Sequence, residues 1–102
     1  MPSLQFINNN PGGGPQSVKL FKKITTLGAD NTNDISIPDP SIDANHAYII
    51  FDGKHYNISP VNRKSVILIN GRQEKNYKLT HKDVITLGEV NLTFDLFDEI
   101  DT

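Results

Sequence analysis

Residues 84–96 have the sequence VITLGEVNLTFDL, and they decide the fold class of this chain. Every second residue from Val90 to Leu96 is apolar, a spacing typical of a β-strand with one buried face. The apolar run 84–87 precedes it, and Gly88-Glu89 between the two matches the length of a tight hairpin turn. The segment therefore predicts two antiparallel strands joined by a short turn.

Short apolar segments of the same kind recur along the chain and are separated by turn residues. They cover Leu4–Ile7, Val18–Leu20, Ile24–Leu27, Ile35–Ile37, Ala47–Phe51, Tyr56–Ile58 and Val66–Ile69, and Leu79 is grouped with the apolar run 84–87. Asp52-Gly53 and Asn70-Gly71 are two-residue hairpin signals. No stretch has a convincing helical period, so we expect an all-β sandwich of nine to eleven short strands.

Composition limits the chain to one soluble domain and excludes several classes of chemistry. Of 102 residues, 36% are hydrophobic, and the net charge of −2 is not that of a nucleic-acid-binding protein. The absence of cysteine excludes disulfides, thiolate catalysis and thiolate zinc sites. Neither a signal sequence nor an apolar run long enough to span a membrane is present, so we expect a cytoplasmic protein.

Two segments are expected to lie outside the packed core. Residues 8–16 are rich in Asn, Gly and Pro and predict a flexible loop. Residues 98–102 are acidic and predict a tail that begins a linker. The domain itself is expected to cover residues 1–97.

Five motifs follow one another in a specific order from Leu27 to Gly88. They are Leu27-Gly28, Asn33–Asp39, His46-Ala47, Asn70–Arg72 and Leu79–Gly88. Together they resemble the forkhead-associated (FHA) domain. This resemblance implies an FHA-like β-sandwich of about eleven short, mostly antiparallel strands, which binds phosphothreonine peptides through loops at one end.

The departures from the FHA pattern lie where that family contacts phosphate. The Arg of its Gly-Arg pair is Ala29, and the Ser of its Ser-x-x-His motif is Asp43, followed by Ala44. The Asn that usually holds the peptide backbone is Ser65, or Asn62 if the register of that loop slips. Lys82 also departs from the pattern, because it stands in place of a Gly in the closing motif. These changes predict that the usual phosphothreonine contact is lost.

Four residues match scaffold positions of the FHA pattern and are expected to be structural. Gly28 permits a tight strand exit, and His46 can join loops through its two ring nitrogens. Asn70-Gly71 accepts the positive φ angles of a hairpin turn.

We therefore expect a non-catalytic protein-interaction module of a signalling or assembly protein. Its partner is another protein or another domain of the same protein, with no nucleic acid, no small-molecule substrate and no cofactor. The candidate contact residues in the apical loops are Ala29, Asp30, Asn31, Asp43, Ala44, Asn45, Asn62, Arg63, Lys64 and Ser65. These loops give a mixed-charge surface, with Asp30, Asp39 and Asp43 opposite Arg63, Lys64 and Arg72.

Two other functions stay open at this point. The first is a phosphothreonine reader that uses the cations Arg63 and Lys64. The second is a purely structural or dimerisation domain whose contacts are made by a sheet edge.

Other candidate sites do not have the spacing that their chemistry needs. Gly12–Gly14 lacks the Lys-Ser/Thr of a phosphate-binding loop, and the three histidines lack the spacing of metal ligands. Asp43 and His46 are three residues apart, but no motif supplies a nucleophile. The lysines at positions 19, 22 and 23 near Phe21 are better explained as protection of an edge strand than as a nucleic-acid site.

Overall fold

The computed structural model describes residues 2–7, 15–62 and 64–96, and these residues form eleven β-strands without a helix. The strands are β1 (Ser3–Ile7), β2 (Pro15–Lys19), β3 (Ile24–Gly28), β4 (Ile35–Ser36), β5 (Ala47–Phe51), β6 (Tyr56–Pro60), β7 (Ile67–Ile69), β8 (Arg72–Glu74), β9 (Tyr77–Lys78), β10 (Val84–Leu87) and β11 (Val90–Asp95). The predicted all-β class is therefore confirmed.

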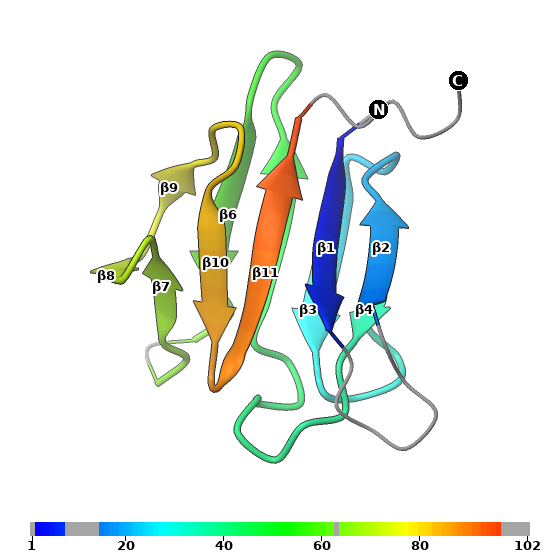
Figure 1. Cartoon of the computed structure of the whole chain (residues 1–102), viewed down its shortest axis with the longest axis vertical. Helices are drawn as coiled ribbons and strands as arrows, with labels where there is room; N and C mark the ends of the chain where they lie inside the picture. The colour runs from blue at the N-terminus through cyan, green and yellow to red at the C-terminus, as the bar shows by residue number, and fades with distance from the viewer. Residues whose placement is uncertain (1, 8–14, 63, 97–102) are drawn as a thin grey trace.

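The strands form two sheets that pack face to face (Figure 1). The larger sheet has the order β2-β1-β11-β10-β7-β8, and the smaller sheet has the order β4-β3-β5-β6-β9. Every pair is antiparallel except β3 and β4, which are parallel. The sandwich architecture and the mostly antiparallel pairing agree with the expectation from the sequence.

The hydrophobic core lies between the two sheets because one face of each strand is apolar. In β11, Val90, Leu92 and Phe94 are buried, whereas Asn91 between them is exposed. The same alternation buries Ile67 and Ile69 of β7. The period-two pattern that predicted the strands therefore also fixes which side chains face the core.

The Asn70-Gly71 turn joins β7 to β8 as a two-residue hairpin. Both residues have positive φ angles, 52° and 87°, which is the geometry of a type I′ turn. The Asn70 side chain also accepts a hydrogen bond from the Val84 amide (2.9 Å) and donates one to the buried Asp83 carboxylate (2.9 Å). This turn therefore connects the β7–β8 hairpin to the start of β10.

Two local expectations were wrong. A loop was expected over residues 8–16, but strand β2 begins at Pro15, because residues 15–19 pair with β1. Proline is tolerated at this position because β2 is an edge strand. Residues 8–14 and 97–102 lie outside the described part of the chain. The connection after Phe51 is a four-residue loop, 52–55, since Asp52 accepts the amide hydrogens of Lys54 and His55 (2.9 and 2.7 Å).

The lysines at positions 19, 22 and 23 do not share one role. Lys19 lies on the edge strand β2, as expected. Lys22 and Lys23 instead lie in the loop between β2 and β3, so they do not protect a sheet edge. The edge-strand explanation is therefore wrong for these two.

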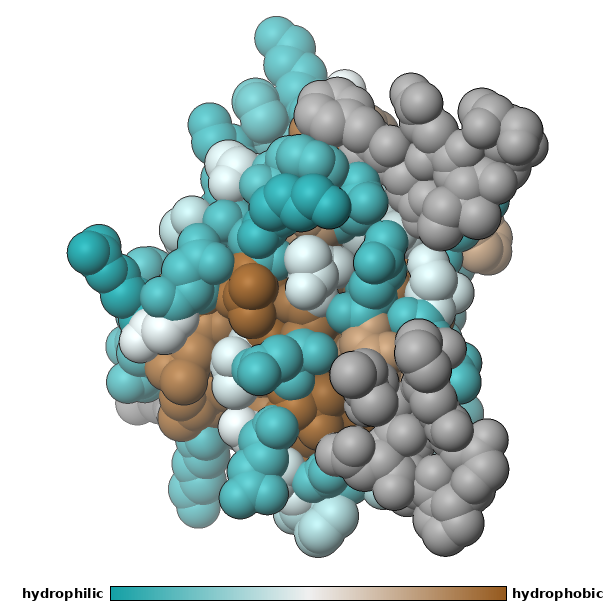
Figure 2. Space-filling view, viewed as in Figure 1, coloured by the Kyte–Doolittle hydropathy of each residue, from teal (hydrophilic) through white to brown (hydrophobic). Residues whose placement is uncertain are grey.

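The outer face of the larger sheet is covered mainly by hydrophilic side chains, with hydrophobic surface visible between them near its middle (Figure 2). None of the described residues belongs to a helix that is long and apolar enough to span a membrane.

Replacing Ile58 by alanine is expected to destabilise the domain by about 2–5 kcal/mol, because the side chain is fully buried between the sheets (0% exposed). Ile24→Ala is the matched control, since that side chain is 48% exposed; we expect it to cost less than about 1 kcal/mol. Urea denaturation measures both free energies of unfolding. Equal losses in the two variants would contradict the placement of the core.

Candidate functional site

Three loops and one turn meet at one end of the sandwich, which we call the apical end (bottom of Figure 1). They are the β3–β4 loop (29–34), the β4–β5 loop (37–46), the β6–β7 loop (61–66) and the β10–β11 turn (88–89). Hydrogen bonds link these segments to one another, so the candidate residues are held by neighbours that lie far away in the sequence.

The end of β3 lies against the backbone of the β4–β5 loop. A Cβ atom on Gly28 would lie 2.2 Å from the carbonyl oxygen of Ala44, so only glycine fits there. The amides of Ala29 and Asp30 donate to the carbonyls of Asp43 and Ala44 (2.9 and 3.1 Å). The two loops that carry these residues are thus joined through main-chain atoms, independently of the side chains at positions 29 and 44.

His46 connects three segments of the apical end. Its Nδ1 accepts a hydrogen bond from the Asp43 amide (3.1 Å), so the ring proton lies on Nε2, which donates to the Val66 carbonyl (2.8 Å). Its own amide donates to the Leu27 carbonyl, and its carbonyl accepts from the Val61 amide. The ring is therefore buried, neutral and used at both nitrogens.

This arrangement also excludes a catalytic pairing of Asp43 with His46. The group that contacts the imidazole is the amide of Asp43, and the carboxylate of Asp43 is turned to Ser65. A general base needs an orienting acceptor and a nucleophile within hydrogen-bond reach. His46 has instead a peptide N–H on one side and a peptide carbonyl on the other.

The Asp43 carboxylate and the Ser65 hydroxyl join the β4–β5 loop to the β6–β7 loop. Ser65 is buried (5% exposed) and donates to Oδ2 of Asp43 at 3.0 Å. Asn62 folds back on its own loop, where its side-chain oxygen accepts the amides of Lys64 and Ser65 (2.9 and 3.1 Å). Asn62 and Ser65 are thus held by contacts within the apical end.

A cleft of about 290 Å³ opens beside this contact. Asp43, His46, Lys64 and Val66 line one part of it, and residues of the β10–β11 hairpin line another. An acidic and a basic residue therefore line the same small space. The cleft offers a partner one anchor of each sign.

Asp39 adds a further carboxylate to this end of the molecule. The hydroxyl and the amide of Ser41 both donate to it (2.6 and 2.9 Å), and these bonds hold the pKa of Asp39 below its ordinary value of 3.8. The Ser41 hydroxyl also accepts a hydrogen bond from the Glu89 amide (2.8 Å). Ser41 therefore attaches the β10–β11 turn to the β4–β5 loop.

The other candidate contact residues differ in what holds them. Asn31 and Asn45 are exposed, and Arg63 lies outside the described residues. Arg72 begins β8 beside Ile69, at the opposite end of β7 from the apical loops. Its inclusion in the mixed-charge surface was therefore wrong, because the tight Asn70-Gly71 turn keeps it at that far end.

The predicted contact residues did not include two side chains that organise this end. Asn33 donates its side-chain amide to the carbonyls of Ala44 (2.6 Å) and Asp30 (2.9 Å). Ser41 has the bridging role described above. The order Asp39-Pro40-Ser41 is a pattern in which an aspartate accepts hydrogen bonds from the second residue after it, so that turn was detectable from the sequence.

The three histidines lie in different parts of the structure. His46 is apical, whereas His55 lies in the β5–β6 loop and His81 in the β9–β10 loop. Among the described residues, no three His, Cys, Asp or Glu side chains gather as potential metal ligands.

The FHA domain family model matches residues 25–88 of this chain. The fold is similar to that of the FHA domain of CT664 from Chlamydia trachomatis, with a TM-score of 0.77, 24% identity and coverage of 95% of this chain and 98% of that one. It is also similar to the FhaA FHA domain in complex with the intracellular domain of Rv3910 (0.79, 21%, 92% and 99%). An FHA domain analysed for phosphothreonine-dependent interactions gives 0.78, 18%, 95% and 97%. No curated protein matches the sequence.

Gly28→Ala is expected to lower the free energy of unfolding by about 1–3 kcal/mol, because the added methyl group overlaps a backbone oxygen that cannot turn away. Ala29→Ser, one residue further along, is the control and should be nearly neutral. Urea denaturation gives the loss, and amide hydrogen exchange at Asp30 reports the loosened loop. An unchanged denaturation midpoint would show that the two loops do not depend on this close approach.

The Asp39 carboxylate is expected to titrate below pH 3.8, so its contact with Ser41 stabilises the loop above that pH and is lost as the pH falls through the lowered pKa. Ser41→Ala should move the midpoint of Asp39 upward, because one donor is gone. Asp52 is the internal control: the amides of His55 and Lys54 also lower its pKa, and the substitution should not affect it. The pH dependence of the carboxyl NMR chemical shifts measures both titration midpoints. An unchanged midpoint of Asp39 in the variant would show that the Ser41 hydroxyl does not lower its pKa.

Proposed function

Because this chain belongs to the FHA domain family, whose members are non-catalytic protein-interaction modules, we propose that its apical end binds a partner protein without the usual phosphothreonine contact. The partner is another protein, or another domain of the same signalling or assembly protein. The observation that carries the proposal is the Asp43 carboxylate, which stands at the apical cleft with Ser65 as its hydrogen-bond donor.

The charge at position 43 opposes a phosphate. In the FHA pattern, a bound phosphate meets an arginine at the position of Ala29 and a hydroxyl group at the position of Asp43. The phosphate carries a charge of about −1.5 to −2. Ala29 has no donor, and each missing charge-assisted hydrogen bond is worth about 1.5–3 kcal/mol. One like-charge pair at about 4 Å costs up to about 4 kcal/mol at an effective dielectric constant near 20.

The charges that are present favour a protein surface with groups of both signs. Asp30, Asp39 and Asp43 are carboxylates of the apical loops, and Lys64 is a cation at the same cleft. Complementary charges of this kind determine orientation and the choice of partner more than total affinity. The exposed apolar side chains of Val61 and Val66 add surface that a partner can bury.

Lys64 supports a second candidate function, in which the domain binds a phosphopeptide that approaches from the side of the β6–β7 loop. An exposed lysine contributes only about 0–1 kcal/mol to an ion pair. Because the Asp43 carboxylate lines the same cleft, the gain from Lys64 is offset there. The phosphate-independent contact is therefore the function that the geometry supports better.

A titration with a degenerate phosphothreonine peptide library, beside its unphosphorylated twin, tests the proposal by NMR chemical shifts. We expect no phosphate-dependent shifts at Ala29, Asp43 or Lys64, because the site lacks the cationic fork and carries a carboxylate. The double variant Ala29→Arg/Asp43→Ser restores the family's donor groups and should gain such shifts.

Two results would contradict the proposal. Shifts confined to these loops with only the phosphorylated pool would make the chain a phosphopeptide reader. A double variant that gains nothing would show that charge at positions 29 and 43 is not what prevents phosphate binding.

A further inference from the structure

The larger sheet ends in an edge strand that has no described strand on its outer side. The outermost strands of the two sheets are β2, β8, β4 and β9, and β2 with five residues is the longest of them. Because very short edge strands offer little to a pairing chain, β2 is the edge at which another strand adds most readily. It forms one side of the sandwich, at the right of Figure 1.

The hydrogen bonds between β1 and β2 determine which main-chain groups of β2 face outward. Leu20 donates its amide hydrogen to the Pro2 carbonyl at 2.8 Å, and the register of the two strands places these residues opposite each other. Bonded and unbonded pairs alternate along an antiparallel ladder. Val18 therefore bonds to β1, whereas Ser17 and Lys19 direct their N–H and C=O groups away from it.

Pro15 agrees with this alternation. It lies two residues before Ser17, so its nitrogen also faces outward, where the missing N–H costs no hydrogen bond to β1. The main chains of Ser17 and Lys19 take no part in the hydrogen bonds that the described residues form outside their strand ladders. Each of these two residues thus carries a free donor and a free acceptor at the edge.

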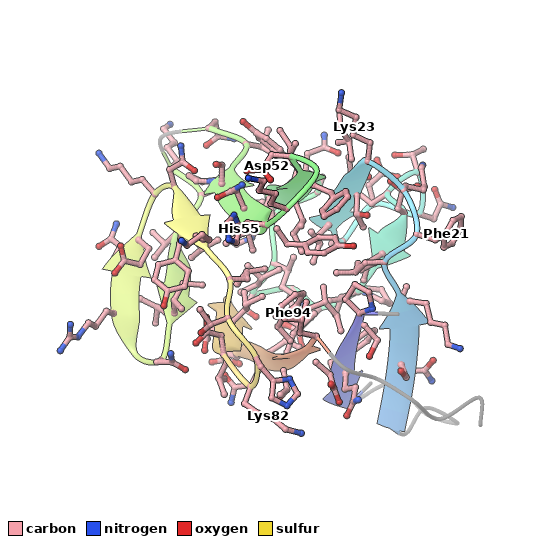
Figure 3. The ribbon with its side chains drawn as sticks, turned by 90° about the horizontal axis from the view of Figure 1, so that it is seen from above. Phe21, Lys23, Asp52, His55, Lys82 and Phe94 are labelled. Atoms are coloured by element: carbon pink, nitrogen blue, oxygen red, sulfur yellow. The ribbon has the colours of Figure 1, made fainter. Side chains whose placement is uncertain are left out.

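The side chains along this edge carry little charge. Gln16 and Ser17 are neutral and exposed, and Val18 is half-buried against the core. Lys19 is the one charged residue of the strand. Phe21 follows shortly after β2, lies on the same side of the molecule and points outward (Figure 3), and its side chain is 75% exposed.

The free main-chain groups of β2 are complementary to those of a second copy related by a two-fold axis at Val18. Antiparallel pairing then places Ser17 of each copy opposite Lys19 of the other, and each such pair exchanges two hydrogen bonds. All the free donors and acceptors of Ser17 and Lys19 are used. An axis at Ser17 would instead place Lys19 opposite Pro15, which has no N–H to donate to the Lys19 carbonyl.

The side chains favour the same axis. Val18 meets its counterpart at a non-hydrogen-bonded position, where opposite side chains are closest. Each Lys19 lies opposite a serine, so the two ammonium groups are diagonal neighbours whose weak repulsion is screened by salt. An axis at Lys19 would place them directly opposite each other. Phe21 falls beside the start of the second copy's β2, which covers part of the exposed ring.

We propose that this domain forms a homodimer in which β2 pairs antiparallel with β2 of a second copy, so that the two larger sheets become one continuous sheet. A contact along one strand buries little area, so the dimer is weak and needs a high local concentration. The side chains of the apical cleft take no part in the pairing. Failure of the phosphopeptide titration would therefore leave this proposal unaffected, and the reverse also holds.

Cysteine substitution tests the register, because the chain has no cysteine of its own. Val18→Cys is expected to form a disulfide-linked dimer on air oxidation, since Cα atoms in a non-hydrogen-bonded pair are about 4.5 Å apart, a distance that a disulfide spans. Ser17→Cys should cross-link much more slowly, because it lies opposite Lys19. Gln73→Cys, on the edge strand β8, is the control and should stay monomeric.

Sedimentation equilibrium of the unmodified chain measures the association itself. We expect the mean mass to rise with concentration up to about 1 mM. Ser17→Pro should weaken association at least about tenfold, because it removes a donor that faces the second copy and is not used by β1. Phe21→Ala should weaken it severalfold, whereas Val61→Ala, at an exposed valine of the apical end, is the control and should not change it. Unchanged urea midpoints show that the variants are folded.

Lys19→Gln tests the sign of the charge effect. Removing the like charges should strengthen self-association by up to about fivefold, and added salt should strengthen it in the unmodified chain. Weakening by either change would mean that Lys19 faces a carboxylate of the other copy, which this register does not allow.

Three further results would overturn the proposal. The first is a constant monomer mass over the whole concentration range. The second is cross-linking of Ser17→Cys or Gln73→Cys as fast as that of Val18→Cys. The third is undiminished association of a folded Ser17→Pro variant, which would place the interface on another surface.

Discussion

The apical end depends on a buried imidazole whose two nitrogens have opposite roles. His46 accepts a peptide hydrogen at Nδ1 and donates one at Nε2, so it needs one tautomer and no net charge. An amide side chain also has a donor and an acceptor, but not at the opposite ends of a rigid ring. The ring thereby joins the β4–β5 loop to the end of the β6–β7 loop, and it lines the cleft that opens beside them.

Around this histidine, the scaffold of the FHA fold is kept, whereas the loop residues that contact a ligand in the FHA pattern have changed. Main-chain bonds to Asp43 and Ala44 and the close approach at Gly28 join the β3–β4 loop to the β4–β5 loop without using the side chains at positions 29 and 44. The contact between Asp43 and Ser65 then uses two positions that face a ligand in the FHA pattern for a bond within the protein. A fold held by backbone atoms tolerates such changes, which is why membership of a family determines architecture before it determines ligands.

Much of the fold could be predicted from the sequence because strands report their buried face through a period of two. The Asn70-Gly71 turn was equally predictable, because its positive φ angles favour asparagine and glycine. Lys82 shows why the FHA pattern has glycine at its position: its φ is 71°, which costs a residue with a side chain about 1–2 kcal/mol.

The candidate site was less predictable, because its contacts join atoms that the sequence separates. The spacing of Asp43 and His46 suggested a pair of side chains, but the contact uses the Asp43 amide. The length of the loop after Phe51 was misjudged because the Asp52 carboxylate organises two further amides.

The pairing of β1 with β11 places the first and last strands of the domain side by side. Ser3 lies opposite Asp95, so the first and last strands meet at the end remote from the apical loops (Figure 1). Polypeptide grafted before β1 or after β11 starts beside its counterpart and leaves the loops unobstructed. The domain is therefore suited to insertion into a surface loop of a host protein, and to circular permutation, with little disturbance of either partner in the fusion.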